Sequence, residues 1–158
     1  LDAVGAVLAA DRSGEDGRGL FAPYLSAPLA FADRLSEGFL VGSLDLTVRG
    51  RDGRYRIVDY KTDQLAGAQR PYAPAGMAAH MAAHHYPLQA LFYAVALHRF
   101  LRSRLAGYDP ERHLGGVDYF FVRVVGDASS EPGDGLLTWA ITPGAVAAAS
   151  DALGGRDG

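Results

Sequence analysis

The chain has 158 residues, of which 49% are hydrophobic and 21% charged, and its formal net charge is −3 at pH 7. This length and composition predict one globular domain with a real core, and they exclude a disordered chain. The absence of cysteine excludes disulfides, thiolate zinc sites and an iron–sulfur cluster, and the negative charge argues against strong DNA affinity of the chain by itself.

No apolar run approaches the about 18–20 residues that a membrane span needs. No basic and apolar leader opens the chain, so we expect a cytoplasmic protein without a membrane anchor.

Residues 1–37 carry the weakest pattern. We expect a short helix over 1–10, where apolar residues share one face, and a flexible Gly/Asp/Arg-rich loop over 11–19. Because the first residue is Leu and not Met, we interpret 1–37 as the truncated start of a domain whose main part is 38–154. The last residues, 155–158, are expected to be a frayed tail.

Residues 38–62 carry the most specific pattern in the sequence. Two β-rich apolar runs flank a segment of Gly, Asp and Arg, which predicts a β-hairpin. A loop of three residues, 51–53, would place Gly53 in the left-handed conformation that such loops favour. The strands would then pair with Leu46 opposite Val58.

The same register sets Asp45 opposite Asp59 and, because side chains alternate along a strand, puts Lys61 on the face of Asp59. Two buried and opposed carboxylates repel each other, so one takes a proton or a cation lies between them. Oxygen ligands suit Mg²⁺, and a neighbouring lysine suits metal-assisted phosphodiester hydrolysis. A slip of one residue would turn Asp45 to the opposite face.

The lysine is notable because the chain has fourteen arginines and only this one lysine, Lys61. Arginine cannot replace a compact ammonium group in a tight site. An Asp-x-Lys triplet by itself is more often a solvated surface feature than a site.

The next segment predicts a helix over 75–85 and a second helix that begins near Pro87 and ends near Leu105. His80 and His84 share a helix face at a spacing that can bind zinc. We favour a role without metal, because the sequence supplies no third ligand nearby.

The second helix has an apolar stripe that we interpret as core, and beside it a row formed by Tyr86, Gln89 and Tyr93. The spacing alone favours packing tyrosines and a solvated glutamine.

Two further strands are predicted at Val117–Val125 and Leu136–Ile141, as neighbours in the sheet. Asp118 lies in the first of them, and we expect it to face solvent at the start of the strand. Thr142 is expected to cap a final helix that Gly154 ends.

Taken together, these motifs resemble the RecB-like branch of the PD-(D/E)XK nuclease family. The resemblance extends from about Gly38 to Arg123. It depends on five segments and two helix residues: Gly42–Asp45, Asp59–Thr62, Met77–Tyr86, Leu91–Leu101, Gly115–Arg123, and Gln89 with Tyr93.

The resemblance implies an α/β fold of the restriction-endonuclease-like type, with a mixed sheet flanked by helices. It implies a nuclease that uses Mg²⁺, or Mn²⁺ as a substitute. Asp45, Asp59 and the backbone carbonyl of Tyr60 would hold the metal, and Lys61 would position the attacking water or stabilise the transition state. Three helix residues would lie against the site, near the DNA or a metal ligand: Tyr86, Gln89 and Tyr93.

The same resemblance implies that the intact protein is a helicase–nuclease of double-strand-break repair and recombination. Its implied partners are DNA, RecC-like and RecD-like subunits, and a RecA-type recombinase. No Walker loop occurs in the chain, so the helicase motor is not part of it.

One departure from the family pattern concerns a metal-binding histidine that usually precedes the first Asp. The first histidine here is His80. We therefore expect weakened metal binding and little or no cleavage by this chain alone. The alternative function is a catalytically incomplete docking module that recruits a recombinase or partner subunits.

Overall fold

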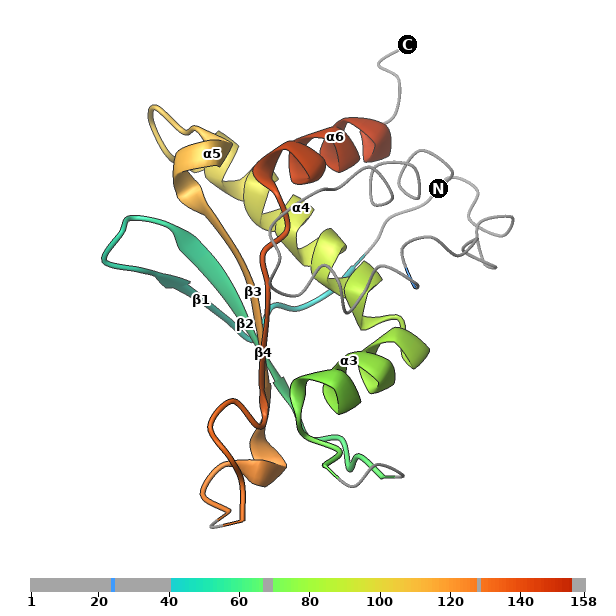
Figure 1. Cartoon of the computed structure of the whole chain (residues 1–158). Helices are drawn as coiled ribbons and strands as arrows, with labels where there is room; N and C mark the ends of the chain where they lie inside the picture. Colours follow the sequence, from blue (N-terminus) through green and yellow to red (C-terminus); the bar gives the residue numbers. More distant parts are fainter. Residues whose placement is uncertain (1–23, 25–40, 67–69, 128, 155–158) are drawn as a thin grey trace.

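The computed structural model describes residue 24 and residues 41–66, 70–127 and 129–154 (Figure 1). The helix expected over 1–10, the loop over 11–19 and the tail over 155–158 lie outside the described residues.

The described residues form a mixed sheet of four strands in the order β1-β2-β3-β4. The outer pairs are antiparallel and the central pair, β2 and β3, is parallel. The expected α/β fold with a mixed sheet is confirmed. The strands are β1 Leu46–Arg49, β2 Tyr55–Lys61, β3 Leu114–Phe121 and β4 Leu136–Trp139.

The β1–β2 hairpin has the predicted register, with Leu46 opposite Val58. Gly53 has a φ of +83°, the left-handed conformation expected of it, and its N–H donates to the Gly50 carbonyl at 3.0 Å. This register turns Lys61 to the helix-covered face of the sheet, and it turns Tyr60, which is 48% exposed, to the other face.

Helices α3 and α4 lie along one side of the sheet (Figure 1). The sequence analysis predicted helices over 75–85 and from near Pro87 to near Leu105, so each predicted end lies within two residues of the observed end. His85, with a φ of +58°, forms the corner between them. Among the described residues, no helix is long and apolar enough to cross a membrane. The helical segments are α3 Pro74–Ala83, α4 Tyr86–Arg104, α5 Pro110–His113, the short 3₁₀ turn η2 Val122–Val124 and α6 Pro143–Leu153.

The core lies between this helical layer and the sheet. Met77 of α3, Leu91 of α4, and Tyr119 and Trp139 of the sheet are all fully buried. The final helix begins as predicted, because the Thr142 hydroxyl accepts a hydrogen bond from the Ala145 N–H at 3.2 Å. Side chains of β2 that point toward this layer, such as Asp59 and Lys61, are therefore buried.

Asp118 is where the sequence prediction was wrong. Arg56, on the adjacent parallel strand, donates from Nε and Nη2 to the two carboxylate oxygens, each at 2.8 Å, and the Thr138 hydroxyl donates at 2.6 Å. The side chain of Asp118 is 15% exposed. Burial alone would raise the pKa of Asp118, but the hydrogen bonds from Arg56 and Thr138 bring it below its usual value.

The Asp118→Asn variant is therefore expected to lower the free energy of unfolding by about 1–3 kcal/mol, because it breaks a charge-assisted bidentate pair. Urea denaturation at pH 7.5 measures this loss. The depressed pKa stabilises the fold above about pH 4, the unfolded value, so the difference between variant and parent should shrink as pH falls through the folded pKa. Equal urea midpoints at pH 7.5 would contradict the structural role of the pair.

Candidate active site

The C-terminal end of β2 carries a buried acid and a buried base on the same face. Asp59 is 3% exposed and Lys61 is 8% exposed. The Nζ atom of Lys61 lies 2.6 Å from Oδ2 of Asp59. The two residues lie two positions apart on a strand, so their side chains point together into the space under α4.

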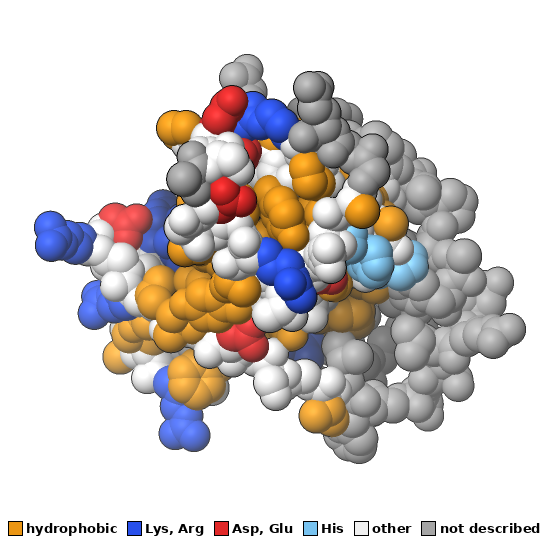
Figure 2. Space-filling view, turned by 90° about the horizontal axis from the view of Figure 1, so that it is seen from below, with side chains coloured by type: hydrophobic (Ala, Val, Ile, Leu, Met, Phe, Trp, Pro, Cys, Tyr) orange, Lys and Arg blue, Asp and Glu red, His pale blue; other side chains and the backbone are white. Residues whose placement is uncertain are grey.

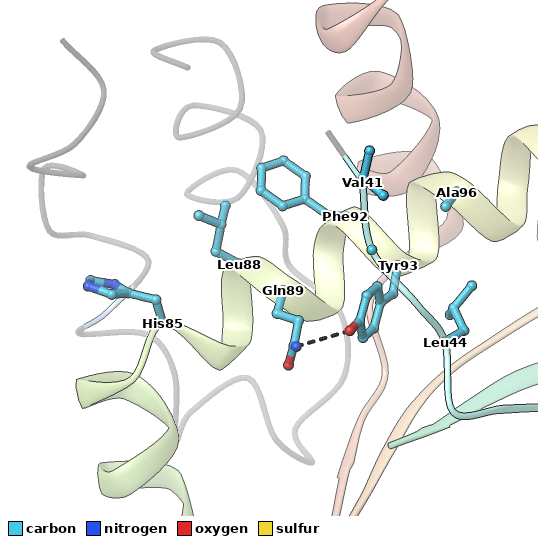
Figure 3. Close-up of a pocket in the computed structure, with 9 residues that line it drawn as sticks. Val41, Leu44, His85, Leu88, Gln89, Phe92, Tyr93 and Ala96 are labelled. Carbon is cyan, nitrogen blue, oxygen red and sulfur yellow. Dashed lines mark hydrogen bonds between the residues drawn. The ribbon is translucent and has the colours of Figure 1, made fainter. Parts of the chain in front are cut away.

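Helix α4 and strand β3 surround the lysine with further partners. Gln89 accepts a hydrogen bond from Lys61 Nζ at 2.9 Å, and its own Nε2 donates to the Tyr93 hydroxyl at 3.0 Å (Figure 3). The ammonium group also lies 3.9 Å from the ring centroid of Tyr86 and 5.5 Å from that of Tyr119. The structure thus brings Tyr86 and Gln89 into contact with Lys61, and Tyr93 into contact with Gln89.

Asp45 contacts the same strand through a hydrogen bond that the sequence analysis did not predict. It precedes β1 instead of pairing within it, and its side chain is exposed, not buried. Its Oδ2 accepts the backbone N–H of Tyr60 at 2.9 Å. Since that N–H belongs to the peptide bond after Asp59, Asp45 is held beside Asp59 by the backbone.

The electrostatics of Asp59 are those of an incompletely neutralised charge. Burial raises its pKa, Lys61 lowers it, and the nearby carboxylates of Asp45 and Asp63 raise it again, so that the pKa lies above its usual value. Lys61 Nζ, at 2.6 Å from the buried Oδ2, lowers the pKa of Asp59, but it does not offset the effect of burial, and no other described residue donates to that oxygen. A further cation at this position would therefore be favourable.

These oxygens fit a hard divalent ion. Mg²⁺ commonly takes one or two protein carboxylates and keeps several waters, which Asp59 and Asp45 could provide, with the Tyr60 carbonyl as a further oxygen. Within the described residues, no group of three or more His, Cys, Asp or Glu side chains is arranged to hold an ion.

His80 and His84 make contacts of another kind. His80 Nε2 lies 3.1 Å from Asp63 Oδ1, and His84 Nδ1 lies 2.8 Å from the His80 carbonyl. Their rings stack with centroids 4.0 Å apart. His80 thus contacts the loop after β2, and His84 contacts the backbone of α3.

Asp63 is a site neighbour that the sequence analysis missed. Its Oδ1 accepts hydrogen bonds from the Tyr86 hydroxyl at 2.9 Å and from His80. It follows β2 in a loop, where an aspartate has no pattern to distinguish it. Only its close spacing to Lys61 was visible in the sequence.

A pocket of about 390 Å³ lies beside α4, and Gln89 and Tyr93 are among the residues that line it (Figure 3). Its walls are mostly apolar, and neither Asp59 nor Lys61 is among the residues that line it. The residues that line it are Val41, Gly42, Leu44, His85, Leu88, Gln89, Phe92, Tyr93 and Ala96.

Comparison with known proteins agrees with this geometry. The family model of the PD-(D/E)XK nuclease superfamily matches residues 4–138. The RecBCD enzyme subunit RecB of Mycobacterium tuberculosis (strain ATCC 25618 / H37Rv) is 40% identical over 155 residues, which cover 95% of this chain and 14% of the relative.

The RecB subunit of Escherichia coli (strain K12) is 42% identical over 119 residues, which cover 75% of this chain and 10% of the Escherichia coli subunit. The RecB subunit of Mycolicibacterium smegmatis is 44% identical over 133 residues, which cover 73% of this chain and 12% of that subunit. The chain thus spans 10–14% of the length of these relatives. Since the family model covers most of the chain, and the acid–lysine pair lies where β2 ends under α4, the chain belongs to the PD-(D/E)XK nuclease superfamily and is similar to part of RecB subunits.

Proposed function

We propose that this chain is the Mg²⁺-dependent DNA nuclease domain of a RecB-type helicase–nuclease that acts in double-strand-break repair and recombination. The observation that carries the proposal is the buried Asp59, whose charge Lys61 neutralises only in part. A purely structural ion pair would be expected to hold the pKa of its acid below the usual value, as Asp118 shows. An acid whose pKa is shifted by burial and by a specific charged partner is a candidate for a functional site.

The residues have distinct roles in this proposal. Asp59, Asp45 and the Tyr60 carbonyl bind the ion, which when bound supplies a Lewis acid and lowers the pKa of a coordinated water. Lys61 holds a positive charge beside the reacting phosphate, where it orients the attacking water or stabilises the negative charge that develops. Gln89 holds Lys61 in place by its hydrogen bond.

The names of the relatives, which are subunits of a RecBCD enzyme, support RecC-like and RecD-like partners, whereas the recombinase is proposed from the family resemblance alone. We propose RecC-like and RecD-like subunits, DNA, and a RecA-type recombinase as partners in the cytoplasm. The face in Figure 2 shows hydrophobic surface interspersed with acidic and basic side chains and histidines, and its described residues form no continuous basic surface. With a net charge of −3, the domain would depend on other parts of such an assembly to deliver the strand.

The proposal is tested by titrating Mg²⁺ or Mn²⁺ while following thermal stability. A ligand that binds only the folded state stabilises it, by about 2.7 kcal/mol at a hundred times its Kd. We expect the metal to stabilise the parent chain but not Asp59→Ala. The control is Asp118→Asn, which changes a carboxylate on the opposite face of the sheet, and the metal should stabilise it as much as it stabilises the parent. If millimolar metal leaves the parent unchanged, the metal site is not formed by this chain.

One observation favours a second candidate, the docking module that recruits a recombinase or partner subunits. The first histidine of the chain, His80, contacts Asp63 and not the Asp59 cluster, so it does not replace the metal-binding histidine of the family pattern. We therefore expect little or no cleavage by the chain alone. Robust Mg²⁺-dependent cutting would show that the histidine is dispensable, and a missing metal response would favour docking.

A further inference from the structure

We infer that Asp63 is a positioning residue for Lys61, which acts through the aromatic ring of Tyr86. The inference deepens the proposed function, because it states what holds the lysine of the same site. It concerns a loop residue outside the acid–lysine motif, together with its partner His80 on α3.

The first step is the hydrogen bond between Asp63 and Tyr86. Tyr86 donates its hydroxyl proton to Asp63 Oδ1 at 2.9 Å, and His80 Nε2 approaches the same oxygen at 3.1 Å. Burial and the Asp63 carboxylate raise the pKa of Tyr86 to about 12, so the phenol remains a donor at any physiological pH. A hydrogen bond to a carboxylate is among the stronger ones, and it fixes the hydroxyl end of the ring.

The second step is the contact between the ring and the lysine. Lys61 Nζ lies 3.9 Å from the centroid of Tyr86, well within the about 6 Å over which an ammonium group is attracted to an aromatic face. Tyr86 is the first residue of α4. The Tyr119 hydroxyl donates to its carbonyl at 3.0 Å, and the two rings stack at 12°. The backbone of Tyr86 is thus fixed by Tyr119, and its ring tip by Asp63.

Asp63 is itself held from two sides. The Tyr72 hydroxyl donates to the Asp63 carbonyl at 3.1 Å and accepts the Leu65 N–H at 3.3 Å, which braces the loop. His80 projects from α3, which packs on the sheet, and its ring meets that of Phe121 edge-on at 6.3 Å. Asp63 therefore connects a braced loop and α3 to the ring beneath the lysine.

This arrangement matters because the contact between Lys61 and Asp59 is not permanent in the proposed function. An Asp59 oxygen that serves as a metal ligand is less available to the ammonium group. The Tyr86 ring and the Gln89 amide oxygen do not bind the metal in this scheme, so they keep Lys61 in place while Asp59 changes partner. A flexible four-carbon side chain needs such an anchor to act as a point charge at a fixed position.

The experiment uses the fact that Lys61 is the single lysine of the chain. Lysine labelled with ¹³C at Cε gives one ε-methylene signal in an NMR spectrum of the metal-free protein. Because this methylene adjoins an ammonium group over an aromatic face, its protons are expected upfield of their position in the unfolded chain. Tyr86→Leu should abolish most of that displacement.

Two variants separate positioning from simple contact. Tyr86→Phe keeps the ring but removes the hydroxyl, and Asp63→Ala removes its acceptor. Each should lose much of the upfield displacement, and the double variant should lose no more than either alone. Asp63→Asn should retain it, because the amide oxygen still accepts from Tyr86. Asp127→Asn is the matched control, since Asp127 accepts two hydrogen bonds from Ser129 in an exposed loop.

The indole signal of Trp139, the single tryptophan and fully buried, reports whether each variant is folded. If Asp63→Ala unfolds the chain, the lysine signal of Tyr86→Phe tests the inference without it. An unchanged lysine signal in folded Tyr86→Phe would overturn the inference. The measurement uses neither metal nor DNA, so its failure leaves the nuclease proposal intact, and a missing metal response would leave this inference intact.

Discussion

Replacing Lys61 by methionine is expected to lower phosphodiester hydrolysis by about 10²–10³-fold, the usual loss when one preorganised group that stabilises transition-state charge is removed. Metal binding should be retained or strengthened, because Oδ2 of Asp59 is released from its 2.6 Å ion pair. Lys61→Arg should not restore the rate. A planar guanidinium cannot occupy the space of a compact ammonium group that lies 2.9 Å from Gln89 and 3.9 Å from the centre of the Tyr86 ring.

Single-turnover assays with the protein in excess over linear DNA suit this comparison, since the chain alone is expected to cut slowly. Calorimetry with Mn²⁺ on the same preparations separates binding from chemistry. Arg102→Met, which removes an exposed cation at the end of α4, is the control for net charge. A Lys61→Met variant with the parent's rate would assign the catalytic charge to another group.

The part of the site that was predictable from sequence is the part built by local chain geometry. Gly53 in a short loop fixes the hairpin register, and the period of two along β2 then puts Asp59 and Lys61 on one face. The corner near Pro87 was visible for the same reason, because proline restricts the backbone of its own residue. Local patterns of this kind therefore suffice to predict the register and the helix limits, whereas the family was inferred from a resemblance over several segments.

The part that was not predictable depends on contacts between distant segments. Asp118 was expected to face solvent. Its partner, Arg56, lies 62 residues away on a parallel strand, and no sequence pattern predicts that the two side chains pair. Asp63 was overlooked because loop aspartates are common and its partners are on α3 and α4. Asp45 was expected to be buried opposite Asp59, but it lies just outside β1, where a backbone N–H and not a strand ladder fixes it.

The contrast between Asp59 and Asp118 shows how one sheet supports two uses of a carboxylate. They lie on the neighbouring strands β2 and β3, on opposite faces, and each pairs with one basic side chain. Asp118 receives three hydrogen bonds, so its charge is stabilised and its pKa is lowered. Asp59 has Lys61 as its one close basic partner among the described residues, and because burial outweighs this partner its pKa is raised. The first arrangement stabilises the fold, and under the proposed function the second would favour a bound cation at some expense of stability.

It follows that Asp59→Asn should raise the stability of the metal-free protein at pH 7.5, where Asp118→Asn lowers it. The unfolded carboxyl ionises near pH 4 and the folded one at higher pH, so the ionised Asp59 opposes folding increasingly as pH rises through its folded pKa. The neutral amide removes this penalty, and the Lys61 ammonium group, which loses its counter-charge, keeps its contacts with Gln89 and the Tyr86 ring. Urea midpoints at pH 7.5 and pH 4, with and without Mg²⁺, measure the effect: the gain of the variant should shrink at low pH, and saturating Mg²⁺ should stabilise the parent but not the variant. A metal-free variant less stable than the parent at pH 7.5 would mean that the ion pair with Lys61 stabilises the fold more than burial of Asp59 opposes it, and Asp59 would then be a structural residue like Asp118.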